Sequence, residues 1–201
     1  MSGLFVTFEG GERAGKSTQV AALAERIGAS GRRVVNCREP GGTALGERLR
    51  EALFAGESPA PETELLVFAS ARAQLVHELI RPALDSGAVV LCDRFADSTV
   101  AYQQYGRGLD RSLVSTVNDA ATGGLMPALT VLLDLPPAEA RVRGGAKTDY
   151  MEREEAAFHE RVRAGYLELA AADPQRWLTL DATCAAERLT DDIWERISPL
   201  L

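Results

Sequence analysis

The sequence predicts an α/β protein with a parallel sheet of five strands and helices on both faces of that sheet. Short apolar runs alternate with longer segments whose apolar residues recur at helical spacing, which is the pattern of a parallel sheet with right-handed crossovers. The runs that read as strands are 4–9, 33–37, 88–92, 129–133 and 177–180. The 201 residues contain no repeat or linker, so we expect a single domain over 1–201.

The first strand, turn and helix carry the strongest signal. Residues 4–8 are apolar, aromatic or β-branched, as a buried strand requires, and apolar residues recur at helical spacing after Ser17. Between them, 10–18 read Gly-Gly-Glu-Arg-Ala-Gly-Lys-Ser-Thr and match G-x-x-x-x-G-K-[ST] at every fixed position. The glycines let backbone N–H groups surround an anion at a helix N-terminus. Lys16 can reach the β- and γ-phosphates, and the Ser17 hydroxyl can bind Mg²⁺. The unit predicts a nucleotide phosphate site and a three-layer P-loop NTPase fold.

The first three strands all end in charged residues, namely Glu9 and Glu12, Arg38 and Glu39, and Asp93 and Arg94. Ligands of open parallel sheets bind beyond the carboxyl ends of the strands. A carboxylate there can hold Mg²⁺ through water, and an arginine can hold two phosphate oxygens with its planar fork. The alternative is that these residues form surface ion pairs, which we would favour without the phosphate loop.

Helical patterns fill the intervals between the strands. They cover about 44–54, 62–84, 97–105, 111–121 and 136–142, and two later helices contain 158–169 and 189–197. Asp149 and Glu152 have the spacing of a cap for the helix that contains 158–169. The polar, glycine-bearing stretch 143–148 reads as a mobile loop.

Composition excludes several classes of function. The formal net charge of −7 argues against broad nucleic-acid binding, which favours a basic face. The three cysteines, Cys37, Cys92 and Cys184, stand at no metal-binding spacing, and Cys37 and Cys92, which lie in apolar strand runs, are expected to be buried reduced thiols. The sequence opens with no signal peptide and has no apolar run of membrane-spanning length, so we expect a cytoplasmic protein without a membrane partner.

Several motifs together resemble the thymidylate kinase family. They are Phe8 to Thr18, Arg38-Glu39-Pro40-Gly41-Gly42, Phe68-Ala69-Ser70-Ala71-Arg72, Asp93-Arg94-Phe95 and Ala101-Tyr102-Gln103, in the family's order and spacing. The resemblance extends over essentially the whole chain, and the combination is far more specific than the phosphate loop alone. It implies a nucleoside monophosphate kinase domain that transfers the γ-phosphoryl group of ATP to dTMP with Mg²⁺, giving dTDP and ADP. It also implies a homodimer formed partly by 62–84.

The resemblance assigns the donor side of the site. ATP would be held by Gly10, Gly11, Glu12, Arg13, Ala14, Gly15, Lys16, Ser17 and Thr18. Mg²⁺ would be held by Ser17 and, through water, by Asp93. The catalytic set would be Arg13, Lys16, Asp93 and Arg94.

The resemblance also assigns the base and sugar side of the acceptor. Phe68 would stack on thymine, and Arg72, one helical turn further on, would donate to a thymine carbonyl. Tyr102 would fill the space beside the sugar C2′, and Gln103 would contact the base. Thr99 belongs to the same substrate-binding set. Taken alone, each of these residue types is more often ordinary packing or solvated surface.

At the other end of the acceptor, Glu12 would accept a hydrogen bond from the 3′-hydroxyl. Arg50 and Arg94 would hold the dTMP phosphate, and Glu39 would help to order the Mg²⁺ and phosphate end. Arg50 could instead lie on a solvated helix face, where Arg48 is its neighbour.

One departure from the family pattern bears on mechanism. Family members supply a transition-state arginine either from the phosphate loop or from a flexible lid, expected here at about 143–151. Arg13 stands where lid-type members carry glycine, and Tyr150 stands where they carry arginine. The sequence therefore predicts Arg13 as the catalytic arginine. The alternative is that Arg143 or Arg153 serves from the lid.

Other functions remain open at this stage. A P-loop kinase for another pyrimidine monophosphate fits many of the same residues, and the thymine methyl alone gives limited discrimination between dTMP and dUMP. A GTP-dependent switch would carry an Asn-Lys-x-Asp run, which the sequence lacks. A scaffold with a vestigial phosphate loop would not need Lys16, Ser17 and Asp93 together.

Overall fold

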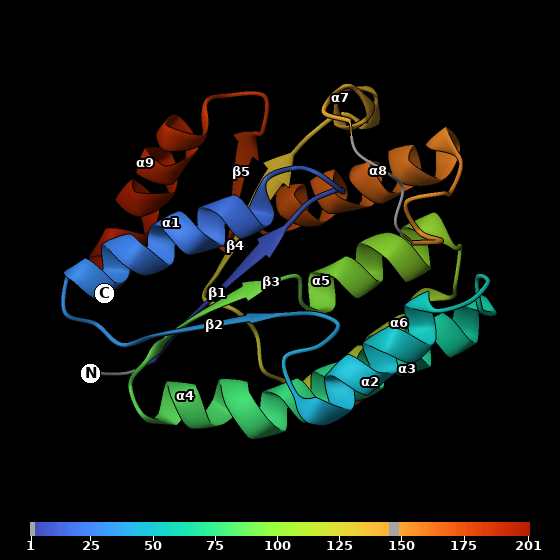
Figure 1. Cartoon of the computed structure of the whole chain (residues 1–201), viewed down its shortest axis with the longest axis horizontal. Coiled ribbons are helices and arrows are strands. Elements are labelled where there is room, and N and C mark those ends of the chain that lie inside the picture. Colours follow the sequence, from blue (N-terminus) through green and yellow to red (C-terminus); the bar gives the residue numbers. More distant parts are fainter. Residues whose placement is uncertain (1–2, 145–148) are drawn as a thin grey trace.

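A single parallel sheet runs through the computed structural model, which describes residues 3–144 and 149–201 (Figure 1). Its strands are β1 (Leu4–Glu9), β2 (Val34–Arg38), β3 (Val89–Asp93), β4 (Leu129–Asp134) and β5 (Trp177–Asp181). They are hydrogen-bonded in the order β2-β3-β1-β4-β5, and every neighbouring pair is parallel. The predicted fold class is confirmed.

The helices follow the predicted intervals closely. They are α1 (Lys16–Ala29), α2 (Ala44–Phe54), α3 (Pro61–Leu75), α4 (Arg81–Asp85), α5 (Ala96–Thr99), α6 (Arg111–Thr122), α7 (Pro137–Val142), α8 (Ala156–Ala172) and α9 (Ala186–Ile197). A π-helical segment, Val76–Ile80, joins α3 to α4, and a second one, Val100–Gly106, continues α5. The helix predicted over 62–84 is therefore one continuous helical segment, in which a π-helical stretch lies between two α-helices. A short 3₁₀ turn, Ser198–Leu200, follows α9.

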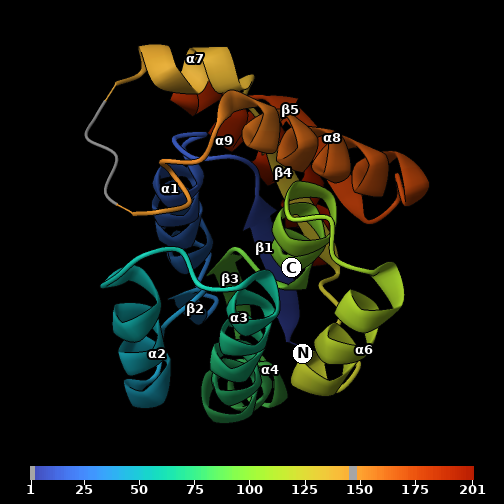
Figure 2. The same ribbon diagram turned by 90° about the vertical axis from the view of Figure 1, so that its right-hand side faces the viewer.

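Helices cover both faces of the sheet, as the arrangement around the strands in Figure 2 illustrates. On one face α1 and α9 pack through Leu23, Ile27 and Ile193 against the strands. On the other face α3, the π-helical segment and α4 contribute Leu75, Ile80 and Ala83 respectively, while α8 covers β4 and β5 with Phe158, Val162 and Tyr166. Each buried Leu or Ile contributes ~1.5–3 kcal/mol of burial free energy, so the two apolar layers hold the strand ends in place.

Local chemistry explains where two of the helices begin. The Thr43 hydroxyl accepts a hydrogen bond from the Gly46 N–H at 2.9 Å and so caps α2. The Asp110 carboxylate accepts from the N–H groups of Ser112 and Leu113 and caps α6. Side chains of these types satisfy donors that a helix N-terminus leaves without partners.

The cap predicted from Asp149 and Glu152 is wrong for α8. The Asp149 carboxylate does accept from the Glu152 N–H at 2.9 Å, but α8 begins only at Ala156, and Glu155 at its N-cap makes no side-chain cap bond. The spacing is instead satisfied by an isolated turn, because an Asp side chain stabilises a turn as readily as a helix start. Of the lid expected at about 143–151, residues 145–148 lie outside the described part of the chain.

No helix among the described residues is long and apolar enough to cross a membrane. Cys37 and Cys92 are buried, and all three cysteines are free thiols.

Topology brings two loops to one point on the sheet edge. β1 and β3 are neighbours, yet α1 after β1 packs on one face of the sheet, and the chain after β3 leads towards the other face. The carboxyl ends of these two strands therefore border a crevice of the kind in which α/β proteins bind ligands.

Candidate active site

The phosphate loop, residues 10–15, connects β1 to the N-terminus of α1. Gly10 has φ +133°, and a Cβ atom there would lie 2.4 Å from the Leu133 carbonyl oxygen, so only glycine fits. The Lys16 ammonium donates to the carbonyls of Gly10 and Gly11 at 3.2 and 2.8 Å. Burial lowers the pKa of Lys16, and the nearby carboxylates, Glu12 among them, oppose that shift. A cation held beside a helix N-terminus is the arrangement that binds phosphate.

Ser17 and Asp93 meet across the crevice. The Ser17 hydroxyl donates to Asp93 Oδ2 at 2.7 Å, which joins the first residues of α1 to the end of β3. A hydroxyl and a carboxylate beside phosphate-binding groups match the oxygen ligands that Mg²⁺ takes in nucleotide sites, with water and phosphate supplying the rest. Within 3–144 and 149–201 no group of three or more His, Cys, Asp or Glu side chains is arranged so that it could hold a metal ion. The residues present thus fit a Mg²⁺ ion shared with a nucleotide.

Arg94 links the phosphate loop to β3. Its backbone has φ +71°, and its N–H donates to the Phe8 carbonyl at 2.9 Å. The guanidinium donates to the Gly10 carbonyl at 3.1 Å and to the Glu12 carboxylate, and it lies 5.0 Å from the centre of the Tyr102 ring. The Arg94 guanidinium therefore contacts both the phosphate loop and Tyr102, which lies in a neighbouring pocket.

Glu12 is held as a carboxylate at this point. Burial acts to raise its pKa, but the positive charges of Arg94 and Lys16 and the hydrogen bond from the Tyr102 hydroxyl outweigh burial and bring the pKa to about 2. The Tyr102 hydroxyl is 3.2 Å from Glu12 Oε1. Glu12 can therefore accept a hydrogen bond from a ligand at any physiological pH.

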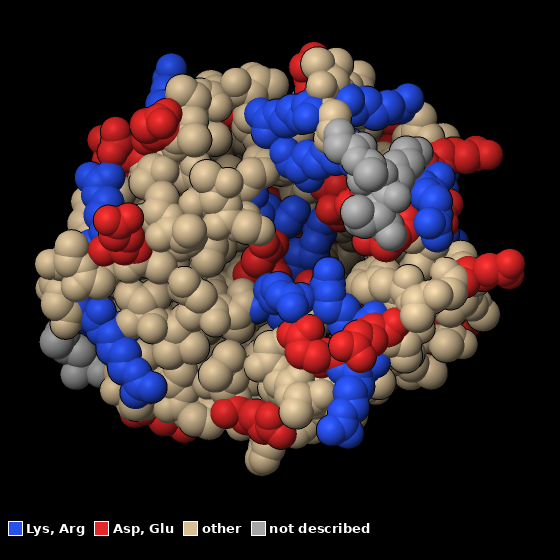
Figure 3. All heavy atoms as spheres, in the orientation of Figure 1, with Lys and Arg blue, Asp and Glu red and all other residues tan. Residues whose placement is uncertain are grey.

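All nine side chains assigned to the acceptor by the sequence line a single cavity of about 100 Å³. A second cavity, about 390 Å³, lies over the phosphate loop and is lined by Lys16, Ser17, Thr18 and Asp93. Glu12, Glu39, Arg50 and Arg94 line both cavities. Figure 3 shows a hollow in this face of the molecule where Lys and Arg side chains gather beside Asp and Glu side chains. Two ligands bound in these cavities would meet between the shared residues.

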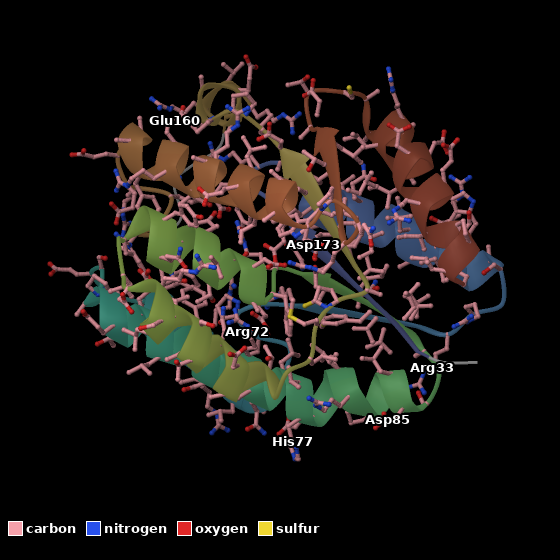
Figure 4. All side chains as sticks on the ribbon, turned by 180° about the vertical axis from the view of Figure 1, so that it is seen from behind. Arg33, Arg72, His77, Asp85, Glu160 and Asp173 are labelled. Carbon is pink, nitrogen blue, oxygen red and sulfur yellow. The ribbon has the colours of Figure 1, made fainter. Side chains whose placement is uncertain are left out.

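Arg72 is buried at the base of the acceptor cavity, 1% exposed, and points into the interior (Figure 4). Its guanidinium contacts Glu39 at 2.6 Å, Asn118 Oδ1 at 2.7 Å and the Thr99 hydroxyl at 2.8 Å. Of the two Nη1 N–H groups, one bonds Asn118, and no described residue accepts from the other. Burial raises the pKa of Glu39, and the Arg72 charge opposes that shift. The pair orders one wall of the cavity and leaves one donor for a ligand.

Gln103 is fixed by a second buried ion pair. Its Nε2 group donates to Glu64 Oε1 at 2.7 Å, and Glu64 is paired with Arg107 at 3.0 Å. Arg107 in turn contacts Glu154, in the segment before α8, at 2.5 Å. The orientation of the Gln103 amide is thus set by groups outside the cavity.

The predicted arginines of the loop and lid lie close together. The Arg13 guanidinium lies 3.5 Å from the Glu152 carboxylate, and Arg143 donates to the Arg13 carbonyl at 2.9 Å. Arg153 is exposed at the rim of a further cavity of about 260 Å³ between the loop, α7 and α8. Tyr150, at the position where lid-type members carry arginine, is buried with its ring 5.7 Å from Phe54. Its side chain therefore serves packing.

Sequence reasoning missed several polar residues that support the site. Asn118 belongs to α6 and carries no motif, yet it orients Arg72. Glu9 was recognised only as one of the charged strand ends and Tyr166 only as part of a helical pattern, and Ser98, which contacts both, was not singled out. The only signal for Glu9 was a carboxylate that ends an otherwise apolar strand.

The fold and the site together define a class, the P-loop phosphotransferases that act on a small acceptor. A phosphate loop, a Ser–Asp pair suited to Mg²⁺ and an adjoining cavity that shares two arginines are its components.

Comparisons with known proteins identify the family. The family model described as thymidylate kinase matches residues 8–193. A thymidylate kinase of Thermomicrobium roseum is 50% identical over 200 residues, covering 98% of this chain and 95% of the relative. One of Deinococcus radiodurans is 50% identical over 202 residues, covering 98% and 97%. The crystal structure of thymidylate kinase from Ehrlichia chaffeensis superposes with a TM-score of 0.76 at 35% identity, covering 90% of this chain and 93% of that one. The chain belongs to the thymidylate kinase family.

Proposed function

We propose that this enzyme transfers the γ-phosphoryl group of ATP to dTMP in a Mg²⁺-dependent reaction, giving dTDP and ADP, with Arg13 as the catalytic arginine. Family membership supports ATP and dTMP as the substrates. The observation that carries the proposal is the pair of cavities that meet at Glu12, Arg50 and Arg94, since an acceptor phosphate held by these residues would lie beside the phosphate loop. We also propose that the chain acts as one kinase domain.

The chemistry needs alignment and charge neutralisation more than a protein nucleophile. An oxygen of the dTMP phosphate attacks the γ-phosphorus, a new P–O bond forms, and the bond to the bridging oxygen of ADP breaks. Lys16 and Arg94 both donate to the Gly10 carbonyl, at 3.2 and 3.1 Å, and these two cations would lower the repulsion between the two phosphates. Mg²⁺ held by Ser17 and, through water, by Asp93 would neutralise charge on the transferring group.

The acceptor cavity supports a deoxythymidine ligand. Phe68 can stack on the base, and the remaining N–H of Arg72 can donate to a base carbonyl. Tyr102 is buried beside Glu12, where it would restrict the sugar 2′ position while Glu12 accepts from the 3′-hydroxyl. These roles follow the resemblance residue by residue.

The first experiment is ADP production from ATP and Mg²⁺ with and without dTMP, dUMP, CMP and AMP. We expect strong stimulation by dTMP and weaker stimulation by dUMP, because a thymine methyl in an apolar pocket contributes ~1–3 kcal/mol. Stimulation by another monophosphate in place of dTMP would overturn the assignments of Phe68, Arg72 and Tyr102 but keep the kinase mechanism. Absence of stimulation by every acceptor would overturn both.

Arg13 is supported by its position. It lies within the phosphate loop at φ +61°, and its contact with Glu152 holds its side chain against the segment that follows the lid. We expect Arg13→Ala to lower kcat by ~10³-fold or more, with little change in KM for dTMP. Arg153→Ala is the matched control, because Arg153 is the competing lid arginine and is exposed. A larger loss in Arg153→Ala than in Arg13→Ala would reverse the assignment.

We further propose a homodimer that uses α3. Leu66 on α3 is 55% exposed and Leu113 on α6 is 40% exposed, so apolar side chains remain outside the core on both helices. Sedimentation at micromolar concentration should give twice the monomer mass, and Leu66→Asp should shift the equilibrium towards monomer. If the unsubstituted protein sediments as a monomer at this concentration, the homodimer proposal is wrong.

A further inference from the structure

Glu9, the last residue of β1, is fully buried directly beneath the phosphate loop. Its Oε1 accepts a hydrogen bond from the Phe95 N–H at 2.8 Å. Its Oε2 accepts from the Ser98 hydroxyl at 2.5 Å and from the Tyr166 hydroxyl at 3.0 Å. These donors come from the start of α5, which follows β3, and from α8, so one carboxyl group joins β1 to two segments that are distant from it in sequence.

The same contacts fix Arg94. The Arg94 N–H bonds the Phe8 carbonyl, and the next N–H along the chain, that of Phe95, bonds Glu9. These two bonds hold Arg94 at φ +71°, a conformation that a residue with a Cβ atom adopts at a cost. The guanidinium also donates to Ser98 Oγ at 3.4 Å and to the Tyr166 hydroxyl at 3.3 Å. Both the backbone and the side chain of Arg94 thus depend on the groups around Glu9.

The carboxyl group of Glu9 and the two hydroxyl groups of Ser98 and Tyr166 form a triangle of contacts, because the two hydroxyl oxygens lie 2.8 Å apart. When Glu9 is ionised, the two hydroxyl hydrogens can make hydrogen bonds along only two of the three sides of this triangle. When Glu9 carries a proton, three hydrogens are present and each side can hold one hydrogen bond. The geometry therefore accommodates an added proton without moving a heavy atom.

We propose that Glu9 is a positioning residue for Arg94, and that its carboxyl group takes up a proton in the Glu9–Ser98–Tyr166 triangle when the acceptor phosphate binds. The proposal rests on the proposed contact between Arg94 and the dTMP phosphate. A neutral Glu9 leaves the Arg94 charge less compensated, and Arg94 then attracts a phosphate dianion more strongly. By reciprocity, a bound dianion favours the protonated form of Glu9.

The electrostatics agree with this coupling. Burial and the negative charge of Asp97 raise the pKa of Glu9 to about 7, against the hydrogen bond from Ser98 and the charge of Arg94. The titratable groups that face Glu9 are Arg94, Asp97 on α5, Lys16 on α1, Tyr166 on α8 and Cys92 on β3. Burial raises the pKa of Tyr166 and of Cys92, so both stay neutral near neutral pH.

The test is calorimetry of dTMP binding at pH 7.5 in two buffers of different ionisation enthalpy. We expect an uptake of about half a proton per site in the unsubstituted enzyme, if binding raises the pKa of Glu9 by about one unit. The phosphate ester, with a second pKa of ~6, is already mostly dianionic at this pH. Glu9→Gln, which keeps the shape and the hydrogen-bonding capacity of the neutral acid, should abolish the uptake.

The same change should appear in kinetics. Between pH 7 and 9 we expect KM for dTMP to rise about three- to fivefold in the unsubstituted enzyme and less than twofold in Glu9→Gln. Tyr166→Phe removes a donor to the ionised carboxylate and should move the proton uptake to higher pH. It provides a second variant should Glu9→Gln fail to fold, which thermal unfolding would reveal.

Two further variants separate this inference from the proposed function. Asp134 also ends a strand and pairs with Arg163 at 2.7 Å, so Asp134→Asn should keep the full proton uptake. Arg94→Met should weaken dTMP binding. If Arg94→Met binds dTMP as tightly as the unsubstituted enzyme, the phosphate assignment is wrong. If Arg94→Met binds weakly but Glu9→Gln keeps the proton uptake, or if Tyr166→Phe leaves its pH dependence unchanged, the Glu9 proposal is wrong.

Discussion

Glu9 and Glu12 stand three residues apart at the start of the phosphate loop, and their surroundings shift their pKa values in opposite directions. Beneath the loop, burial and the charge of Asp97 raise the pKa of Glu9 to about 7. At the mouth of the loop, burial is outweighed by Arg94 and Lys16, and the pKa of Glu12 is about 2. The difference teaches that protonation here is decided by which neighbours tertiary packing supplies, because the two residues are of the same type and lie only three positions apart in the chain.

Arg94 lies between these two carboxyl groups, so its removal should have the largest effect. We expect Arg94→Met to lower kcat/KM for dTMP by ~10²–10³-fold, because a buried charged partner of the acceptor phosphate is lost. Steady-state kinetics with varied dTMP measures this. Arg163→Met, which removes an arginine paired with Asp134, is the control and should stay within a few-fold of the unsubstituted enzyme. Equal losses in both variants would contradict a specific role for Arg94.

Replacing the carboxylate at the mouth of the loop should have the next largest effect. We expect Glu12→Gln to lower kcat/KM for dTMP by ~10–100-fold, because a charge-assisted hydrogen bond to the 3′-hydroxyl is weakened. The same substitution should change activity on 3′-deoxy-dTMP much less, since that analogue has no such hydroxyl. An equal loss on both substrates would show that Glu12 does not act through a contact with the 3′-hydroxyl.

The two carboxyl groups should also shape the pH dependence of stability with opposite signs. The pKa of Glu9 rises on folding from 4.5 to about 7, so its stabilising contribution is full below pH 4.5 and is lost as the pH rises through 7. The pKa of Glu12 falls from 4.5 to about 2, so its contribution is full above pH 4.5 and is lost as the pH falls towards 2. Urea unfolding of Glu9→Gln should show a free energy of unfolding that declines less between pH 5 and 8, by on the order of 2 kcal/mol. An unchanged decline would show that Glu9 does not titrate in this range.

The smallest expected effect concerns one hydroxyl group. Tyr166→Phe keeps the ring that packs in the α8 layer and removes the bond to Glu9. We expect a loss of about 1–2 kcal/mol in the free energy of unfolding at pH 8, where Glu9 is ionised, and a smaller loss at pH 5.5. Thermal or urea unfolding at the two pH values would measure this. An equal loss at both would indicate a packing defect instead.

Much of the fold could be predicted because its signals are local, whereas the acceptor set was implied by the resemblance to the thymidylate kinase family. The phosphate loop is a contiguous motif, the strands are contiguous apolar runs, and Phe68 and Arg72 share a helix face through their spacing. The structure confirms the sheet and gathers all nine acceptor side chains around one cavity. Their individual roles, and that of Arg13, stay predictions. The cap assigned to Asp149 and Glu152 was wrong because the same spacing also suits an isolated turn.

By itself, the sequence determined which residues form the sheet, since contiguous apolar runs mark the strands, and it predicted a phosphate site from one contiguous motif. Only the tertiary structure decided what the side chains of the site touch. Arg72 is oriented by Asn118, 46 residues away, and Glu9 meets Tyr166, 157 residues away. The physical reason is that burial and neighbouring charges set the state of an ionisable group, and both arise only when segments distant in sequence pack together.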